Sequence, residues 1–288
     1  MTRVRFQQVD VFTRVPFKGN PVAVVLDGEG FSIEEMKAIA NWTNLSETTF
    51  VERPTNPAAD YRLRIFTPRS ELPFAGHPTI GSAHAILRSG YVPKRSGVLV
   101  QECGKGLLEL RIEGERLFLR LPAPTFTVAD EQDVADATAA LGIPETAIEN
   151  AALIDVGPVW LTVQLRDGQA VTNLKPDIEA ITALSRPPRT GLTVFGFYHD
   201  GKPADLEVRS FAPIHGVAED PVCGSGNGCV AAFIQREKLL GDRKSYVSNQ
   251  GRCLERDGRV EIRFGDDGAI WLGGHAVTCI EGSLTREC

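Results

Sequence analysis

The sequence RSFAPIHGVAEDPVCGSGNGC, residues 209–229, joins a β-like run at 206–211 to an apolar helical run at 229–240 through a turn rich in Pro and Gly. Its glycines at 224–228 let the backbone come close to a ligand, because they have no Cβ atom. The helix start behind them offers unpaired N–H groups and the positive end of the helix dipole. The stretch therefore predicts a binding site for an anion, most simply a carboxylate or a phosphate.

The same arrangement occurs once more, nearer the N-terminus. Arg64-Ile-Phe-Thr-Pro68 repeats the Arg-x-Phe-x-Pro pattern of Arg209-Ser-Phe-Ala-Pro213. It leads into a loop with Gly76-His77 and then into a predicted helix of small residues at 82–88. The spacing of the two copies is far longer than that of solenoid repeats. It indicates an ancient duplication into two similar lobes, and we expect one site between the N-termini of their helices.

The composition, with 42% apolar and 24% charged residues in a chain of 288, is typical of a soluble enzyme with a packed core. The net charge of −6 and the lack of a basic run argue against a nucleic-acid partner. No apolar run approaches the roughly 20 residues that span a bilayer. The first residues, MTRVRF, lack the apolar segment of a signal peptide, so we expect a cytoplasmic protein.

Six cysteines, at positions 103, 223, 229, 253, 279 and 288, include no Cys-x-x-Cys pair. Their spacing argues against a zinc site and against a disulfide framework. No Gly-x-Gly-x-x-Gly motif follows a predicted strand, as dinucleotide binding would require. We therefore expect neither a metal nor an organic cofactor.

Strands with period-two alternation and short helices share the chain, which predicts an α+β fold. Ser32 and Glu35 form a capping box for a helix at 32–41. Pro122 marks a boundary between an N-terminal lobe at 1–122 and a C-terminal lobe at 123–275. The closing segment, 276–288, reads as a strand that returns to the first lobe. Further helices are expected at 133–141 and 144–148, and further strands at 3–12, 19–26, 61–66, 97–102, 107–112, 116–121, 152–156, 159–165, 193–199, 244–249, 259–264 and 269–274.

Aligning the two Arg-x-Phe-x-Pro motifs exposes a difference between the halves. Glu47 precedes Arg64 by 17 residues (64 − 47), and Leu192 precedes Arg209 by 17 (209 − 192). One lobe thus carries an acid where the other has Leu192 or its neighbour Gly191. A lone carboxylate at one of two matched positions predicts a single acid/base group. The alternative is that Glu47 only caps a local turn.

Three further side chains lie next to the predicted helix starts. His77 would be a neutral imidazole that contacts a ligand, because a helix N-terminus disfavours positive charge, or else a structural hydrogen-bonding residue. Asp220 would contact a substrate, cap the second helix, or do both. Cys223 is the rival catalytic group, since the helix dipole would lower the pKa of its thiol. Ala75, not a second cysteine, precedes Gly76, which disfavours a racemase with two cysteines.

Six motifs resemble, in order, the PhzF-like family of phenazine-biosynthesis isomerases. The resemblance runs from Val9 to about Gly274, and the motifs are GNPVAV at 19–24, SETTFV at 46–51, RIFTP at 64–68, FAGHPT at 74–79, RSFAP at 209–213 and EDPVCGS at 219–225. That family has the diaminopimelate-epimerase-like fold. The resemblance therefore implies two pseudo-symmetric lobes, each a curved β-barrel around a central helix, with the site in the cleft. It also implies a homodimer.

The resemblance further implies cofactor-free isomerisation of a small carboxylic or amino acid, like that of trans-2,3-dihydro-3-hydroxyanthranilate in phenazine biosynthesis. Glu47 would carry a proton from one carbon to another. Cys223 stands where the family usually has a small Thr-like residue. The alternatives are a racemase or epimerase that uses Cys223 and a non-catalytic metabolite-binding protein. The substrate's carboxylate and polar groups would be held by Gly76, His77, Asp220, Gly224 and Ser225.

Overall fold

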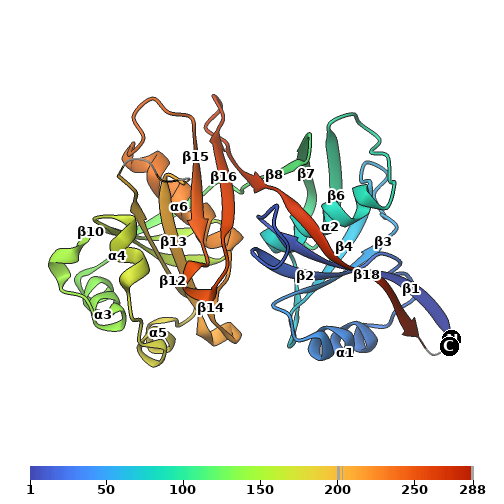
Figure 1. Cartoon of the computed structure of the whole chain (residues 1–288), viewed down its shortest axis with the longest axis horizontal. Helices are drawn as coiled ribbons and strands as arrows, with labels where there is room; N and C mark the ends of the chain where they lie inside the picture. The colour runs from blue at the N-terminus through green and yellow to red at the C-terminus, as the bar shows by residue number, and fades with distance from the viewer. Residues whose placement is uncertain (200–201, 203, 287–288) are drawn as a thin grey trace. The chain divides into compact units, whose positions relative to one another are not determined.

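A computed structural model describes every residue of the chain except 200, 201, 203, 287 and 288. The chain forms two compact units, both of which contain strands and helices (Figure 1). Unit 1 comprises Met1–Arg120 and Gly273–Cys288, and unit 2 comprises Leu121–Leu272. The fold is mixed α+β, as the sequence predicts.

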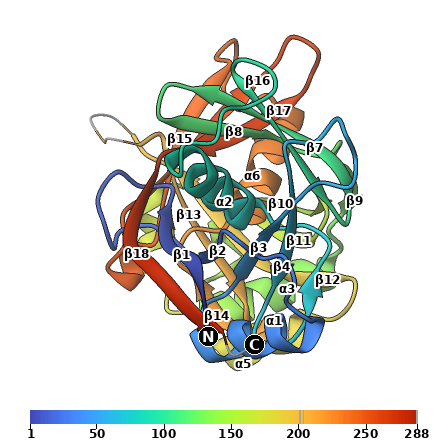
Figure 2. The same cartoon turned by 90° about the vertical axis from the view of Figure 1, so that its right-hand side faces the viewer.

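Unit 1 is a sheet whose strands surround the helix α2 (Gly76–Arg88). The helix contacts β1, β2, β3, β4, β8 and β18, and Figure 2 shows it among the strands of this unit. Most of its residues are buried. A second helix, α1 (Ile33–Thr43), begins at Ser32 with the predicted capping box to Glu35. The strands are β1 (Thr2–Val11), β2 (Asn20–Val25), β3 (Thr48–Glu52), β4 (Tyr61–Phe66), β5 (Glu71–Leu72), β6 (Val98–Cys103), β7 (Gly106–Glu113), β8 (Arg116–Arg120) and β18 (Ala276–Arg286).

Unit 2 is built around α6 (Gly224–Glu237), which contacts β10, β11, β12 and β16. Its other helices are α3 (Glu131–Leu141), α4 (Gly168–Asn173) and α5 (Ile178–Leu184), with short 3₁₀ turns at Glu145–Ala147, Pro213–His215 and Arg252–Leu254. The strands are β9 (Thr125–Val128), β10 (Ile148–Asp155), β11 (Val159–Leu165), β12 (Arg189–Phe197), β13 (Leu206–Ala212), β14 (Val217–Asp220), β15 (Ser245–Gln250), β16 (Gly258–Phe264) and β17 (Ile270–Gly274), where the chain passes back to unit 1.

The two units repeat one order of strand pairing. In unit 1, β1–β2, β3–β4 and β6–β7 are antiparallel, whereas β2–β3 and β4–β6 are parallel. In unit 2, β10–β11, β12–β13 and β15–β16 are antiparallel, whereas β11–β12 and β13–β15 are parallel. Parallel neighbours need a long crossover, and α2 and α6 occupy the equivalent crossovers after β4 and β13. The two Arg-x-Phe-x-Pro motifs therefore start on equivalent strands.

In both units the arginine of that motif holds a glutamate through two hydrogen bonds. Arg64 donates to Glu71 over 2.8 Å from both Nε and Nη2. Arg209 donates to Glu219 over 2.9 Å from Nε and 2.8 Å from Nη2. Each guanidinium also lies over the ring of the phenylalanine two residues further on, 5.3 Å and 5.1 Å from the ring centroid. The repeated Arg-x-Phe-x-Pro motif therefore makes the same arginine–glutamate and arginine–phenylalanine contacts in both units.

Both central helices begin earlier than the sequence analysis predicted. α2 begins at Gly76 and α6 at Gly224, so the glycine-rich segments are the first turns of the helices, not loops before them. The reason is close packing. A Cβ atom at Gly226 would lie 2.4 Å from Oγ of Ser210 on β13. Glycine is needed there inside the helix, despite its poor helix propensity, because a side chain has no room.

Two helices were not predicted from the sequence: α4 and α5, which have only six and seven residues. Each begins at an aspartate, Asp167 and Asp177, whose side chain accepts from backbone N–H groups of the first turn. That N-cap signal was available in the sequence. The helices cover one apolar core with α3 and the β11–β13 strands, formed by Ala137, Leu141, Leu161, Val163, Val171, Ile181, Leu192, Val194 and Phe211, among others.

Candidate functional site

Glu47 and His77 lie side by side at the N-terminal end of α2 in unit 1. Glu47 immediately precedes β3, and its carbonyl accepts from the N–H of Ala23 on β2 over 3.4 Å. His77 is the second residue of α2. Oε2 of Glu47 lies 3.3 Å from Nε2 of His77, and the two side chains are only 15% and 6% exposed. The sheet and the helix thus bring together two proton-active groups that are 30 residues apart (77 − 47).

The Glu47 carboxyl group is held in an environment that favours its neutral form. Burial raises its pKa to about 7, and a hydrogen bond from the Ser46 side chain opposes that rise. Its Oε2 is buried without a hydrogen-bond partner among the described residues. With this pKa, both the acid and its conjugate base are populated near neutral pH. Such a group can both take up and return a proton, as general acid–base catalysis requires.

The first turn of α2 lies next to this pair, and no side chain caps it. Its N-cap residue is Ala75, which has no side-chain oxygen to accept from the first turn. Gly76 follows, with no Cβ atom to obstruct approach to the backbone. The N–H groups and the dipole of the helix therefore favour an anion beside Glu47 and His77.

The equivalent helix start in unit 2 is bordered by Asp220, Cys223, Gly224 and Ser225. Asp220 ends β14, and its Oδ1 accepts from the N–H of Val222 over 3.0 Å. Cys223 is the N-cap of α6, and its Sγ accepts from the N–H of Gly226 over 3.2 Å. Asp220 therefore braces the turn and is not the helix cap, contrary to one of the two roles considered for it from the sequence.

The expectation that the helix dipole makes Cys223 a thiolate was wrong. The side chain is buried, and burial raises the pKa of its thiol, as does the nearby charge of Asp220. The N–H of Gly226 and the hydroxyl of Ser225 act in the opposite direction without overcoming the burial. The dipole is thus outweighed by desolvation, and the thiol form is favoured.

The strand registers identify the residue that matches Glu47 in unit 2. Opposite the phenylalanine of the repeated motif lies Thr48 in unit 1 and Leu192 in unit 2. Glu47 therefore matches the residue before Leu192, which is Gly191. A Cβ atom there would lie 2.0 Å from a backbone oxygen on β13 and 3.1 Å from the ring of Trp160. Unit 2 has no room for an acid at this position.

Two residues that were not predicted from the sequence, Trp160 and Gln250, contact the start of α6. Nε1 of Trp160 donates to Oγ of Ser225 over 3.1 Å, and Gln250 makes three hydrogen bonds to the turn and helix around Cys223. Their sequence separations from the turn are 65 and 27 residues. No local pattern marked them, and only the repeated strand order could have directed attention to their strands.

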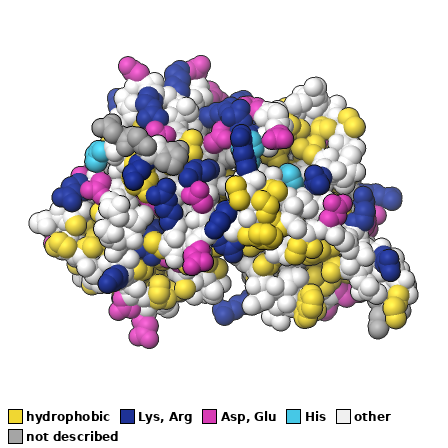
Figure 3. All heavy atoms as spheres, viewed as in Figure 1, with side chains coloured by type: hydrophobic (Ala, Val, Ile, Leu, Met, Phe, Trp, Pro, Cys, Tyr) yellow, Lys and Arg dark blue, Asp and Glu magenta, His cyan; other side chains and the backbone are white. Residues whose placement is uncertain are grey.

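Among the residues described by the structure, no group of three or more His, Cys, Asp and Glu side chains is placed to hold a metal ion. No helix in that part of the chain is both long and apolar enough to cross a membrane. On the face seen in Figure 3, basic and acidic side chains are interspersed over both units.

Comparison with known proteins connects this chain to characterised sequences over nearly its full length. The profile of a family described as phenazine biosynthesis-like protein, PhzC-PhzF, matches residues 9–282. The chain is 43% identical to a Schizosaccharomyces pombe protein called antisense-enhancing sequence 1, over 98% of this chain and 99% of that protein. It is 32% identical to a trans-2,3-dihydro-3-hydroxyanthranilate isomerase of Pseudomonas aeruginosa, over 96% of this chain and 98% of that enzyme.

A solved structure agrees with these sequence relationships. A PhzF-family phenazine biosynthesis protein of Bacillus anthracis superposes with a TM-score of 0.87 at 25% identity. The alignment covers 99% of this chain and 100% of the other.

Proposed function

The chain belongs to the phenazine biosynthesis-like family, whose named members include isomerases, and it is an isomerase of that family; from this premise we propose that Glu47 is its proton shuttle. In this proposal the enzyme needs no metal or organic cofactor. It moves a proton between two carbons of a small carboxylic or amino-acid-like substrate. The relative that isomerises trans-2,3-dihydro-3-hydroxyanthranilate makes that compound the first substrate to test.

The observation that carries the proposal is the pKa of Glu47, raised by burial to about 7 next to His77. A free glutamate is almost fully ionised at neutral pH and is a weak acid–base partner for a carbon. A group with a pKa near the working pH combines the correct protonation state with a useful driving force. Perturbed acids of this kind gather at functional sites.

The proposed reaction has one base. The Glu47 carboxylate removes a proton from a carbon, and the electron pair of the broken C–H bond is delocalised towards the substrate's unsaturated or carboxylate group. The carboxylic acid so formed then gives the same proton to another carbon, so that no atom or electron is gained or lost. In this reading the N–H groups at Gly76 stabilise the charge that builds on the substrate, and His77 contacts the same group. Asp220, Gly224 and Ser225 are the proposed substrate-binding residues of unit 2.

Glu47→Gln tests the proposal, because it keeps the shape of the side chain but cannot take up a proton. We expect turnover of trans-2,3-dihydro-3-hydroxyanthranilate, followed in deuterated water, to fall by roughly 10²-fold or more. Glu52→Gln is the matched control, since Glu52 is a glutamate of the same segment that pairs with Arg62 instead. It should retain turnover. If the wild-type protein leaves this compound unchanged, the same variants are compared for deuterium uptake across a panel of small carboxylates.

The rival reaction uses Cys223, and the same assay separates the two. Cys223→Ser should cost far less than Glu47→Gln, because burial favours the neutral thiol. An inactive Cys223→Ser with a largely active Glu47→Gln would replace the proposal with a cysteine-dependent racemase. Absence of deuterium from every ligand that binds would instead identify a metabolite-binding protein. The homodimer implied by the resemblance stays a prediction, for which sedimentation velocity gives the molar mass.

A further inference from the structure

The turn from Asp220 to Cys223 is tied to the sheet by one side chain, that of Gln250 at the end of β15. Its Nε2 donates to the carbonyl of Asp220 over 2.9 Å. Its Oε1 accepts from the N–H of Cys223 over 3.1 Å and from Nδ2 of Asn227 over 2.7 Å. Gln250 is fully buried. A single amide therefore joins both ends of the turn and the first turn of α6.

The backbone next to Gln250 is packed directly on the same turn. A Cβ atom at Gly251 would lie 2.5 Å from the carbonyl oxygen of Pro221. A Cβ atom at Gly258 would lie 2.3 Å from a methyl group of Val222. Gly251 also has a φ of +98°, which disfavours any other residue. Hydrogen bonds and close contacts thus fix the turn from the same side.

Unit 1 has the same close contact between a glycine and a proline, but no glutamine at the position of Gln250. The parallel pairings place Glu102 in unit 1 where unit 2 has Asn249, so the residue matching Gln250 is Cys103. The following residue, Gly104, approaches Pro73 as Gly251 approaches Pro221: a Cβ atom there would lie 2.8 Å from the proline Cα. The glycine–proline contact is therefore shared by both units, whereas the three hydrogen bonds of the glutamine belong to unit 2.

We propose that Gln250 is a positioning residue for the turn that presents Asp220 and the N-terminus of α6. The inference rests on the proposed function, in which these groups bind the substrate. The amide fixes the Asp220 carbonyl and the Cys223 N–H at the same time, so the segment between them holds one conformation before a ligand arrives. A pre-organised site does not have to order its own loop on binding, which improves affinity and orientation of the substrate.

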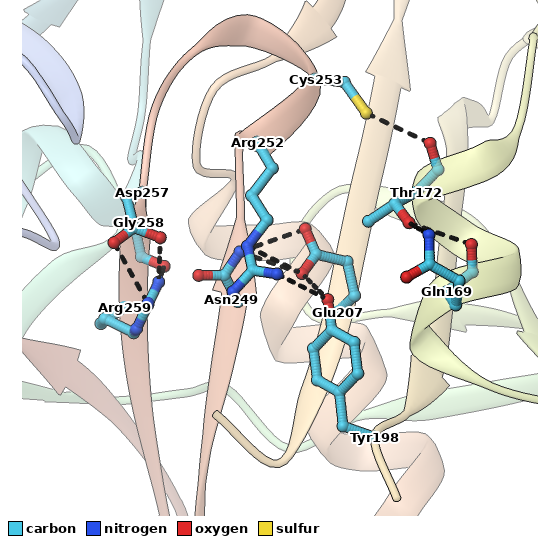
Figure 4. A network of polar contacts seen from close by, with 10 residues as sticks. All are labelled: Gln169, Thr172, Tyr198, Glu207, Asn249, Arg252, Cys253, Asp257, Gly258 and Arg259. Carbon is cyan, nitrogen blue, oxygen red and sulfur yellow. Dashed lines mark hydrogen bonds and ion pairs between the residues drawn. The ribbon is translucent and has the colours of Figure 1, made fainter. Parts of the chain in front are cut away.

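Amide hydrogen exchange tests the positioning role without a substrate. The N–H of Cys223 donates to Gln250, so Gln250→Met should speed its exchange at least tenfold. Gln250→Glu keeps an acceptor oxygen at that place and should restore most of the protection. The matched control is Asn249→Leu on the same strand. Asn249 is also a fully buried amide, but it donates to Glu207 over 3.1 Å and 2.9 Å within a separate network (Figure 4).

A positioning role and a general structural role give different results. Positioning requires faster exchange in peptides covering 217–230 for Gln250→Met but not for Asn249→Leu, at comparable loss of global stability. With a turnover substrate, Gln250→Met should also lower kcat/KM at least tenfold more than the control does. Unchanged Cys223 exchange in Gln250→Met, or equal changes in both variants, overturns the inference. If Glu47→Gln remains active while the exchange result holds, the proposed shuttle is wrong and the positioning of the turn is not.

Discussion

The two central helices begin on equivalent strands and crossovers but have different neighbours. At the start of α2, Glu47 faces His77 at 3.3 Å. At the start of α6, the position of Glu47 is Gly191, and the residue matching His77 is Ser225, which accepts a hydrogen bond from Trp160. Unit 1 thus has two titratable side chains, Glu47 and His77, at the start of its central helix. At the matching place unit 2 has a neutral hydrogen bond between Trp160 and Ser225.

This difference teaches that the two units share the arrangement of strands and central helix, but only unit 1 has a carboxyl group at the residue before the matched strand position. A proton shuttle with a single carboxylate needs no second base opposite it. The close approach of β13 and Trp160 to Gly191 shows that the second acid is not merely absent from the sequence, because the backbone leaves it no space.

The largest expected difference is between the two arginine–glutamate pairs. Arg209 and Glu219 are only 5% and 10% exposed, and Arg209 also donates to two backbone carbonyls, whereas Arg64 and Glu71 are 15% and 37% exposed. Arg209→Met leaves a buried carboxylate without its partner, so we expect it to lower the free energy of unfolding by about 3–5 kcal/mol. Arg64→Met should cost about 1 kcal/mol or less, because its partner remains hydrated. Urea unfolding measures both, and equal costs would contradict the distinction.

The next effect is the pH dependence that Glu47 gives to unit 1. The pKa of Glu47 rises from 4.5 to about 7 on folding, so the folded state binds the proton more tightly than the unfolded state does. The resulting stabilisation is fully present below about pH 4.5 and is lost as the pH rises through about 7. The loss is about 3 kcal/mol, since each pKa unit corresponds to about 1.4 kcal/mol.

Glu47→Gln should abolish that dependence. The variant should be about as stable as the wild-type protein at pH 4.5 and more stable at pH 8, when unfolding is measured across this range. A constant difference between the two proteins at all pH values would show that Glu47 does not titrate near neutrality. Glu52→Gln, at the end of the strand that follows Glu47, serves as the control.

A smaller effect on stability is expected from adding one methyl group at Gly191, the position in unit 2 that matches Glu47. Gly191→Ala places a Cβ atom against the β13 backbone, so we expect a loss of about 1–3 kcal/mol from overpacking. Gly282→Ala on β18 is the control, because its Cβ atom would have no described atom within 4 Å. If Gly191→Ala is as stable as the control, then the lack of an acid in unit 2 has no steric cause.

The smallest expected effect comes from removing the N–H group of Trp160, which donates a hydrogen bond to Ser225 at the start of α6. Trp160→Phe removes the N–H that Ser225 accepts but keeps an aromatic ring against Gly191. We expect a loss of about 1 kcal/mol, the usual net contribution of one hydrogen bond. Thermal unfolding measures it, and Ser225→Ala in the Trp160→Phe background should then add little. Fully additive costs would mean that the two side chains do not interact.

The sequence predicted the α+β class and the repeated motif because both depend on local patterns. Period-two alternation identified the strand β1, and the Ser32–Glu35 box identified α1. The starts of α2 and α6 were misplaced because glycine has a low helix propensity, and tertiary packing overrides it here. Glu47 and His77 were singled out separately, but their contact depends on how β3 and α2 meet.

The residues around the second helix start could not be predicted in the same way. Gln250 and Trp160 act through side chains that reach segments 27 and 65 residues away. The raised pKa of the Cys223 thiol follows from burial, which a local reading of the helix dipole does not include. Local sequence identifies the groups that can react, whereas their surroundings are set by residues distant in the chain.

The pairing of β1 with β18 has a consequence for the order in which the protein can form. Thr2 lies opposite Arg286 and Val11 opposite Ala276, so β1 is paired with the last strand of the described residues. Unit 2 is continuous from Leu121 to Leu272, so all of it is synthesised before β18. During synthesis the unit that carries Glu47 therefore acquires β18 only after the whole of the other unit has been made. Glu47 and His77 belong to the unit whose sheet is completed by this later strand.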